Sequence, residues 1–268
     1  MVTPFTPEGE IDVEAAQRLA VTLVEDGADM ILLAGTTGEA PTTHLPEKQT
    51  LLREVREALA GRAMLMAGAG SNDTAHAVRI GVGSQEAGAE GVYRHIMAIV
   101  EATDLPVMIY DIPGRTGMRI TDETLARLAE HERILAVKDA TGDVEQGFRR
   151  MEATGLEYYS GDDGLNFAWL AHGASGVVSV VAHADAHSWR EMITEVDAGD
   201  LAGARAVARR IRPLVQAIMG GGQGAVMAKE ALLLQGRIPS AALRLPLVRA
   251  EADEVAALRA VLDASGLL

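Results

Sequence analysis

The feature that most constrains the fold is a repeated alternation of short apolar runs with longer amphipathic stretches. Most of the runs are rich in Val, Ile, Leu and Met, as strands covered on both faces should be. The apolar runs are residues 29–35, 63–70, 105–111, 134–140, 157–163 and 176–182. The stretches with helical spacing of apolar residues are 12–25, 46–60, 73–87, 91–103, 122–130 and 144–154. A strand followed by a helix, many times over, predicts a parallel sheet.

A chain of 268 residues with this repeat is expected to form a (β/α)8 barrel, the TIM barrel. The segment VTPF at residues 2–5 is expected to end a first strand. After about residue 186 the strand signals stop and helical patterns continue to the C-terminus. We therefore expect a catalytic barrel over residues 1–186 and a helical domain over residues 187–268. A doubly wound open sheet is the alternative, but no GxGxxG follows the first strand.

Composition excludes several classes of function. The net charge of −14 argues against a nucleic-acid surface, and the absence of cysteine excludes disulfides and thiol catalysis. No uninterrupted apolar stretch of 18 residues is present, so no membrane span is expected. The N-terminus has neither the basic nor the apolar region of a secretory signal, which favours a cytoplasmic protein.

A single lysine in the run ILAVKDATGD, residues 134–143, is the strongest chemical signal. Of the 24 basic residues only three are lysines, so arginine is the usual cation of this chain. Arginine cannot lose its proton at ordinary pH, whereas a desolvated lysine can. Lys138 is therefore either a nucleophilic amine that forms a Schiff base with a carbonyl, or a lysine extending to solvent at a strand end.

Other polar residues follow the expected strands, where the catalytic groups of a parallel barrel lie. Thr36 belongs to GTTGE, Tyr110 ends the run at 105–111, and both are expected to face one cavity with Lys138. Tyr110 is either a proton relay or a core tyrosine, and GTTGE is either a carboxylate-binding loop or an ordinary turn. Arg115 in DIPGRTG is either an exposed arginine or a bidentate carboxylate ligand.

Three further patterns are weak. HADAH, residues 183–187, places two histidines four apart but lacks a clear third ligand, so no metal site is expected. MGGGQG, residues 219–224, follows no strand and is expected to be a junction between helices rather than a phosphate loop. The acidic pair Asp162 and Asp163 is expected to cap a loop or helix.

Taken in order, the motifs VTPF, GTTGE, AGAGSNDT, MIYDIPGRTG, VKDATGD, YYSGDD and GVVSV resemble the dihydrodipicolinate synthase family. This family belongs to the pyruvate-dependent class I aldolases, which also include N-acetylneuraminate lyase. The resemblance covers essentially the whole chain. It implies a TIM barrel with a C-terminal helical domain, a cytoplasmic homotetramer built as a dimer of dimers, and catalysis without a cofactor.

The resemblance also implies roles for individual residues. Lys138 would form the Schiff base with pyruvate, and Tyr110 and Thr36 would relay protons. Thr37 would hold the pyruvate carboxylate, and Arg115 would bind the carboxylate of aspartate semialdehyde. The pocket would also be lined by the backbone of two residues, Gly161 and Val178.

The chain departs from the family pattern in two places. Asp111 stands where many relatives have Asn. In addition, EAGAEGVYRH, residues 86–95, lacks a strand and loop that carry a tyrosine reaching into the neighbouring subunit. Either the natural polypeptide carries this segment and the 268-residue sequence omits it, or the chain has lost it. The first reading is favoured, and it predicts that Glu90 and Gly91 are not joined by a normal peptide.

The sequence leaves two rival functions open and bears on one regulatory property. The chain could be another pyruvate-dependent aldolase acting on a 2-keto-3-deoxy sugar acid, or an impaired member lacking the fourth strand. Arg115 favours the synthase, because a second anionic substrate needs a cation. Leu45 and Lys48 stand where lysine-inhibited members carry histidines, so weak or no feedback inhibition by lysine is expected.

Overall fold

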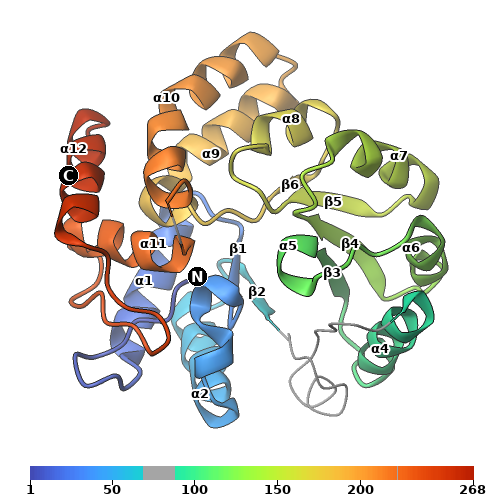
Figure 1. The fold of residues 1–268 in the computed structure, drawn as a ribbon, viewed down its shortest axis with the longest axis horizontal. Helices are drawn as coiled ribbons and strands as arrows, with labels where there is room; N and C mark the ends of the chain where they lie inside the picture. The colour runs from blue at the N-terminus through green and yellow to red at the C-terminus, as the bar shows by residue number, and fades with distance from the viewer. Residues whose placement is uncertain (69–87, 222) are drawn as a thin grey trace. The chain divides into compact units, whose positions relative to one another are not determined.

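The computed structural model describes residues 1–68, 88–221 and 223–268 (Figure 1). The chain divides into two compact units. The first unit combines residues 1–68 with residues 180–268, and the second ends at residue 179 and is described from residue 88. The helix expected over residues 73–87 and the motif AGAGSNDT fall almost wholly outside the described residues.

The second unit is built on a four-stranded parallel sheet with the order β3-β4-β5-β6. The strands are β3 (Val107–Asp111), β4 (Ile134–Asp139), β5 (Glu157–Ser160) and β6 (Gly176–Val177). The helices are α4 (Ala89–Glu101), α5 (Pro113–Thr116), α6 (Asp122–Ala129), α7 (Val144–Thr154) and α8 (Asn166–Ala171). Strands that follow one another in the chain are neighbours in the sheet, which confirms the parallel arrangement predicted from the alternation.

Local sequence explains where these helices begin and how they pack. Thr121 and Asp143 accept hydrogen bonds from backbone N–H groups at the starts of α6 and α7, as good N-cap residues do. The core between sheet and helices includes Tyr158 and Trp169, both fully buried. A Cβ on Gly147 would lie only 1.9 Å from the Trp169 ring, so α7 packs this closely only because residue 147 is glycine.

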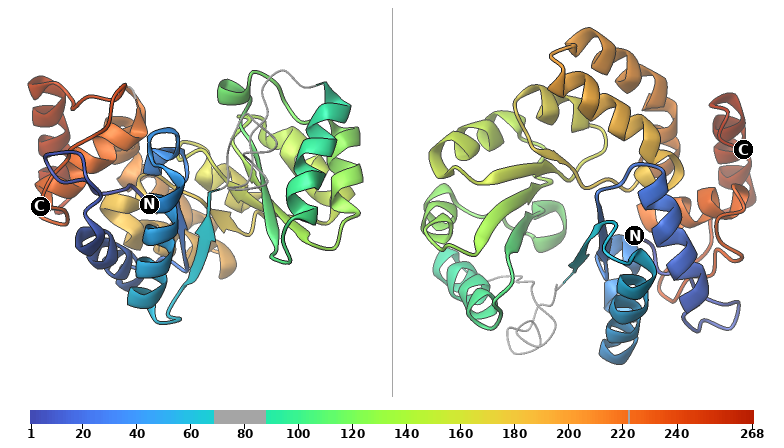
Figure 2. Two further views of the ribbon diagram at one scale, coloured as in Figure 1. Left: turned by 90° about the horizontal axis from the view of Figure 1, so that it is seen from below. Right: turned by 180° about the vertical axis from the view of Figure 1, so that it is seen from behind.

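The first unit joins the N-terminal elements, blue in Figure 2, to the C-terminal helices, which run from yellow-orange to red. Its two strands, β1 (Met30–Leu33) and β2 (Met64–Ala67), are parallel partners. Its helices are α1 (Val13–Glu25), α2 (Leu45–Leu59), α9 (Ala182–Asp197), α10 (Leu201–Met219), α11 (Gly224–Leu234) and α12 (Ala252–Ala264). Short 3-10 turns lie at η1 (Thr36–Gly38) and η2 (Ala40–Thr42). Ala228 and Leu232 of α11 share one apolar core with Leu19 and Leu51.

The expected first strand at residues 2–5 is wrong as a strand. Among the described residues, this segment makes a single antiparallel bridge, from Phe5 to Ile11. The Val2 N–H donates to His183 Nε2 at 2.9 Å, and Thr3 Oγ1 donates to the Gly38 carbonyl at 2.7 Å. Side-chain contacts, rather than a strand ladder, hold the segment in place.

The expected break between Glu90 and Gly91 is also wrong. Both residues lie inside α4, and the Val92 N–H donates to the Gly88 carbonyl at 3.1 Å, so the helix runs through the junction. In the described part of the chain, β2 pairs with β1 and β3 pairs with β4, with no strand joining β2 to β3. The second reading, in which the chain has lost a strand, stays a prediction.

The boundary expected between residues 186 and 187 falls within α9. The backbone of Asp185 departs from helical geometry there, with φ −153° and ψ 72°, and kinks the helix. The division into barrel and helical domain at this point stays a prediction. None of the described helices is long and apolar enough to cross a membrane.

Candidate active site

A row of side chains crosses the sheet near the carboxyl ends of its strands. Tyr110 on β3 is in register with Lys138 on β4, which is in register with Tyr159 on β5. Residues in register on parallel strands point to the same face of the sheet. All three are partly exposed, whereas the next residues along β3 and β4, Asp111 and Asp139, are buried on the opposite face. The sheet thus brings together the two groups, Tyr110 and Lys138, that the sequence predicts to work together.

The amine of Lys138 lies in a poorly solvated position. Its Nζ is 4.3 Å from the centroid of the Tyr110 ring. Burial lowers the pKa of Lys138 to about 8, while the Asp163 carboxylate raises it and the Arg115 guanidinium lowers it. At pH 7 about a tenth of such amines are neutral, against fewer than about one in a thousand for an ordinary lysine. The site can therefore supply a nucleophilic amine at neutral pH.

The backbone beside Lys138 leaves no room for larger residues. A Cβ on Gly161 would lie 2.9 Å from Cε of Lys138, so only glycine fits there without displacing the lysine. The Gly161 N–H donates to the Asp139 carbonyl at 2.7 Å, and the Val178 N–H donates to the Ser160 carbonyl at 2.8 Å. These bonds extend the sheet beyond β5 and β6, and the roles of Gly161 and Val178 as a pocket wall stay a prediction.

Arg115 acts through its charge on both Tyr110 and Lys138. Burial raises the pKa of Tyr110, while Arg115 lowers it and Asp162 raises it. Arg115 is exposed on α5, in the segment that follows β3, and its charge acts on both Tyr110 and Lys138. The structure therefore places the predicted carboxylate ligand close to the predicted nucleophile.

Although Asp163 is expected to cap a loop or helix, the sequence does not predict two of the residues that neighbour Lys138. Tyr159 is its partner in register on β5, and Asp163 is buried and is the carboxylate that raises the pKa of Lys138. Asp163 also accepts a hydrogen bond from Asn166 Nδ2 at 3.1 Å, at the start of α8. The motif YYSGDD contained both residues, and their place at a strand end was the signal that could have identified them.

Thr36 and Thr37 lie in the first unit, on the 3-10 turn η1 that follows β1. Thr36 is exposed and Thr37 is partly buried. Their turn is flanked by two residues with left-handed backbones, Ala34 at φ 53° and Glu39 at φ 55°. Their contribution to the site of Lys138 stays a prediction.

The other two lysines are held differently from Lys138. Lys229 is completely buried, and its Nζ donates to Glu39 Oε1 at 2.5 Å and to the Ala242 carbonyl at 2.7 Å. Lys48 is buried in α2, where burial lowers its pKa. Lys229 is engaged in an ion pair, which makes it a poorer nucleophile than Lys138.

The histidines of HADAH serve a structural purpose. His183 is buried, accepts the Val2 N–H at Nε2 and contacts the Val180 carbonyl through Nδ1 at 2.7 Å. Burial lowers its pKa to about 3, so the ring stays neutral. Within the described ranges, no group of three acidic or histidine side chains could hold a metal ion. Of MGGGQG, residue 222 is outside the described chain, and the rest joins α10 to α11.

Known proteins resemble this chain over its whole length. A model of the Dihydrodipicolinate synthetase family matches residues 1–265. The 4-hydroxy-tetrahydrodipicolinate synthase of Kineococcus radiotolerans is 47% identical, covering 100% of this chain and 92% of that protein. The dihydrodipicolinate synthase structure from Cyanidioschyzon merolae with lysine bound is 39% identical, with a TM-score of 0.94 and coverage of 100% and 97%. The chloride-inhibited enzyme from Acinetobacter baumannii complexed with pyruvate is 31% identical, with the same TM-score and coverage of 100% and 97%.

These matches also bear on the fold and on the missing segment. They confirm the predicted fold class, a (β/α) barrel of the TIM type. The alignment with the Kineococcus protein spans 282 positions against the 268 residues of this chain, a difference of 14 positions with no counterpart here. With its lysine, its strand order and its matches from end to end, the chain belongs to the dihydrodipicolinate synthetase family.

Proposed function

We propose that this chain condenses pyruvate with L-aspartate 4-semialdehyde to give 4-hydroxy-tetrahydrodipicolinate, a step of lysine and diaminopimelate biosynthesis. It is a lyase of the class I, Schiff-base type. The observation that carries the proposal is the half-buried amine of Lys138, whose pKa burial lowers to about 8, at the carboxyl end of β4 in a chain of this family.

The chemistry needs only one activated amine. Nζ of Lys138 adds to the keto carbon of pyruvate, water leaves, and an imine forms. The protonated imine withdraws electrons from the methyl carbon, which loses a proton and becomes an enamine. The enamine carbon then attacks the aldehyde carbon of the second substrate. The amino group of that substrate displaces Lys138 from the imine carbon and closes the ring, so the overall reaction releases one water.

Tyr110 is suited to move the protons of these steps. Lys138 lies against its ring, and burial raises the pKa of the Tyr110 phenol, which keeps the hydroxyl protonated and able to donate. A protonated hydroxyl beside the amine can assist the departure of water from the addition product. Thr36 is proposed to complete the relay, and Thr37 with the amides of its turn to hold the pyruvate carboxylate.

The second substrate is an anion, and Arg115 is the cation proposed to bind it. A guanidinium can grip a carboxylate with two parallel hydrogen bonds. Gly161 and Val178 are proposed to line the pocket with backbone rather than side chain, which the close approach of Gly161 to Lys138 supports. The family resemblance further suggests a homotetramer, which sedimentation of the purified protein would test. It also suggests a location in the cytoplasm.

Borohydride trapping tests the mechanism directly. The reagent, added together with pyruvate, is expected to reduce the imine and leave a stable adduct on the peptide that contains Lys138. Because the chain has only three lysines, peptide mass spectrometry assigns the adduct without ambiguity. Protein treated with borohydride alone is the control. No adduct, or an adduct on Lys48 or Lys229, contradicts the proposed mechanism.

A coupled assay with pyruvate and aspartate semialdehyde separates the rival functions. The proposed synthase turns over both substrates. An aldolase of 2-keto-3-deoxy sugar acids forms the imine but cleaves a sugar acid instead. A member impaired by the lost segment forms the imine and turns over slowly with either aldehyde.

A further inference from the structure

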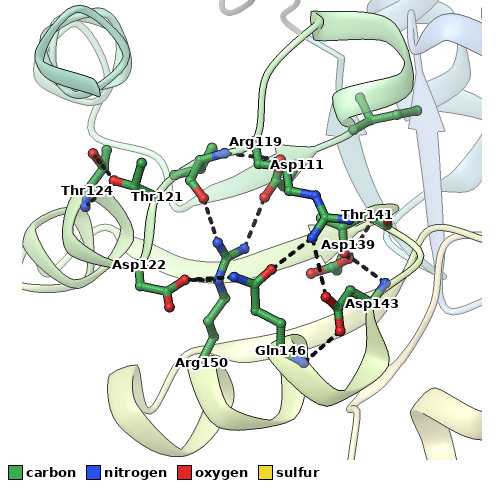
Figure 3. Close-up of polar contacts among 12 residues, drawn as sticks. Asp111, Arg119, Thr121, Asp122, Thr124, Asp139, Thr141, Asp143, Gln146 and Arg150 are labelled. Atoms are coloured by element: carbon green, nitrogen blue, oxygen red, sulfur yellow. Dashed lines mark hydrogen bonds and ion pairs between the residues drawn. The ribbon is translucent and has the colours of Figure 1, made fainter. Parts of the chain in front are cut away.

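A buried ionic cluster lies behind Tyr110 and Lys138, on the other face of the sheet (Figure 3). Asp111 follows Tyr110 on β3, and Asp139 follows Lys138 on β4. Between these strands and α6, Arg150 extends from α7 and is only 5% exposed. None of these residues has a part in the proposed chemistry. Burying three charged groups costs free energy unless the charges are paired and hydrogen-bonded, so the cluster calls for an explanation in the fold or in the site.

Arg150 uses its whole guanidinium on three acceptors. Nη1 donates to Asp111 Oδ2 at 3.1 Å, Nη2 to the Ile120 carbonyl at 2.5 Å, and Nε to Asp122 Oδ1 at 2.7 Å. Asp111 in turn accepts the Ile120 N–H at Oδ1, at 3.4 Å. Residues 111 and 120 are the two ends of one segment, so Arg150 joins the start of that segment to its end.

The segment between these ends carries Arg115. It leaves β3 after Asp111, forms the single turn α5, and returns to the sheet at Ile120 before α6 begins. Inside the segment, Thr116 Oγ1 contacts the Ile112 carbonyl at 3.1 Å and the Met118 carbonyl at 2.8 Å. These local bonds shape the turn, but they do not attach it to the rest of the unit. Two arginines make that attachment: Arg150 at both ends of the segment, and Arg119 near its end, whose guanidinium donates to the Thr141 carbonyl at 3.2 Å and to Gln146 Oε1 at 3.1 Å (Figure 3).

Charge balance in the cluster depends on Arg150. Burial raises the pKa of Asp111, and the Arg150 guanidinium lowers it again. Burial likewise raises the pKa of Asp139, whose Oδ1 accepts the N–H and the Oγ1 of Thr141, both at 2.8 Å. Asp139 thus has two donors from Thr141, whereas Asp111 has the Ile120 N–H and the Arg150 guanidinium.

We propose that Arg150 is a positioning residue for the second substrate: it fixes both ends of segment 112–119 and so holds Arg115 where it can bind the carboxylate of the aldehyde. The inference rests on the proposed function. Lys138 is placed by the ladder of β4 with β3 and β5 and makes no contact with Arg150. Substitution of Arg150 is therefore expected to weaken binding of the aldehyde substrate more than it slows formation of the pyruvate imine.

The first test is Arg150→Lys. It keeps the buried positive charge, but an ammonium group cannot reproduce the three-directional fork. The KM for aspartate semialdehyde is expected to rise about tenfold, as for loss of a charge-assisted hydrogen bond. The rate of borohydride trapping with pyruvate is expected to change less than about threefold. Arg149→Lys is the matched control, because Arg149 is the adjacent residue on α7, is exposed and, among the described residues, forms an ion pair with Glu145 at 3.7 Å.

A double-mutant cycle distinguishes positioning from a general loss of structure. In an Arg115→Ala background, Arg150→Lys is expected to add almost nothing to the KM for the aldehyde, because the group that Arg150 positions is gone. If the two effects multiply, or if imine formation and aldehyde use fall together, the inference is wrong. Asp111→Asn is the second variant should Arg150→Lys fail to fold. It keeps an acceptor for Arg150, and a smaller rise in the same KM is expected, whereas no rise overturns the inference.

The outcomes also separate this inference from the proposed function. If the unmodified enzyme forms no imine on Lys138 or does not consume aspartate semialdehyde, the proposed function fails and this inference fails with it. If the unmodified enzyme does both and Arg150→Lys behaves like Arg149→Lys, only this inference fails.

Discussion

Two lysines, one in each compact unit, are both desolvated and are used in opposite ways. Lys138 lies 4.3 Å from the centroid of the Tyr110 ring, and Lys229 lies 4.2 Å from that of Phe5. Burial is the largest influence on both, and it lowers the pKa of each. Lys229, however, donates to Glu39 and to a carbonyl, whereas the described residues offer Lys138 no hydrogen-bond acceptor. Desolvation without a hydrogen-bonded carboxylate gives a reactive amine, and desolvation with one gives a structural ion pair.

The residues around the two lysines also differ in how far they are bonded to one another. Around Lys229, Arg244 donates its backbone N–H to Glu39 Oε2 at 3.0 Å and its guanidinium to Glu47, whose pKa that hydrogen bond lowers. Around Lys138, the nearest influences are one cation, Arg115, and one buried carboxylate, Asp163, which act on its pKa in opposite directions. The polar groups around Lys229 are hydrogen-bonded to one another, whereas the surroundings of Lys138 leave its amine available to a substrate.

The largest expected effect is on activity at Lys138. Lys138→Arg keeps a cation but provides no usable nucleophile, so kcat/KM is expected to fall by about 10³-fold or more, a barrier increase of about 4 kcal/mol. The coupled assay measures the loss, and a thermal melt checks that the variant is folded. A variant retaining a tenth of the activity would show that another amine does the chemistry.

Next comes the stability contributed by Lys229. Lys229→Met leaves the buried carboxylate of Glu39 without its partner and is expected to lower the free energy of unfolding by about 3–5 kcal/mol. Denaturant unfolding followed by circular dichroism measures it. Lys138→Met is the control: it should be inactive, yet at least as stable as the parent, because it removes a desolvated amine. Equal destabilisation by both substitutions would show that the two lysines contribute alike to the free energy of unfolding.

Removing the cation beside Lys138 should have a selective effect. Arg115→Ala is expected to cost about 1.5–3 kcal/mol in kcat/KM for aspartate semialdehyde, the worth of a charge-assisted contact. Trapping of the pyruvate imine should persist, since Arg115 lowers the pKa of Lys138 only as a secondary influence. Steady-state kinetics with each substrate varied in turn measures the split. Equal loss of both steps would indicate a structural role for Arg115.

The smallest expected effect is the pH dependence of imine formation. Lys138 reacts as the neutral amine, so its reactive fraction rises with pH and levels off above its pKa of about 8. Between pH 7 and pH 8 the rate of trapping with pyruvate is expected to rise about fivefold, and above pH 9 to change little. A rate that keeps rising to pH 10 would mean that Lys138 titrates like an exposed lysine.

Much of the second unit could be predicted from the sequence, because its strands are short, apolar and followed at once by polar residues. The run at 134–140 became β4 (Ile134–Asp139), with Lys138 near its end as expected. The run at 176–182 was less informative, since β6 ends at Val177 and α9 begins at Ala182. An apolar run alone does not distinguish a strand from the approach to a buried helix.

The contacts that the sequence could not predict are those between distant positions. Arg150 lies 39 residues from Asp111, and no local pattern marks either as half of a pair. Glu39 was treated as part of a turn, yet its carboxylate is bound to a lysine 190 residues later. The continuity of α4 through Glu90 and Gly91 was likewise not predicted, because comparison with a family pattern does not say how the chain runs through a departure from it.

The ion pair between Glu39 and Lys229 has a consequence for how the chain is made. During synthesis, residues 1–68 leave the ribosome long before α11 is made. Glu39 therefore has no Lys229 to pair with at that stage, and the core residues of α1 and α2 lack their contacts with Ala228 and Leu232. The second unit is contiguous and contains its own core, and domains generally fold as units in the order of synthesis. Closing so long a loop is slow and exposes apolar surface meanwhile. The middle of this chain is therefore expected to be folded first, and its beginning only once its end has emerged.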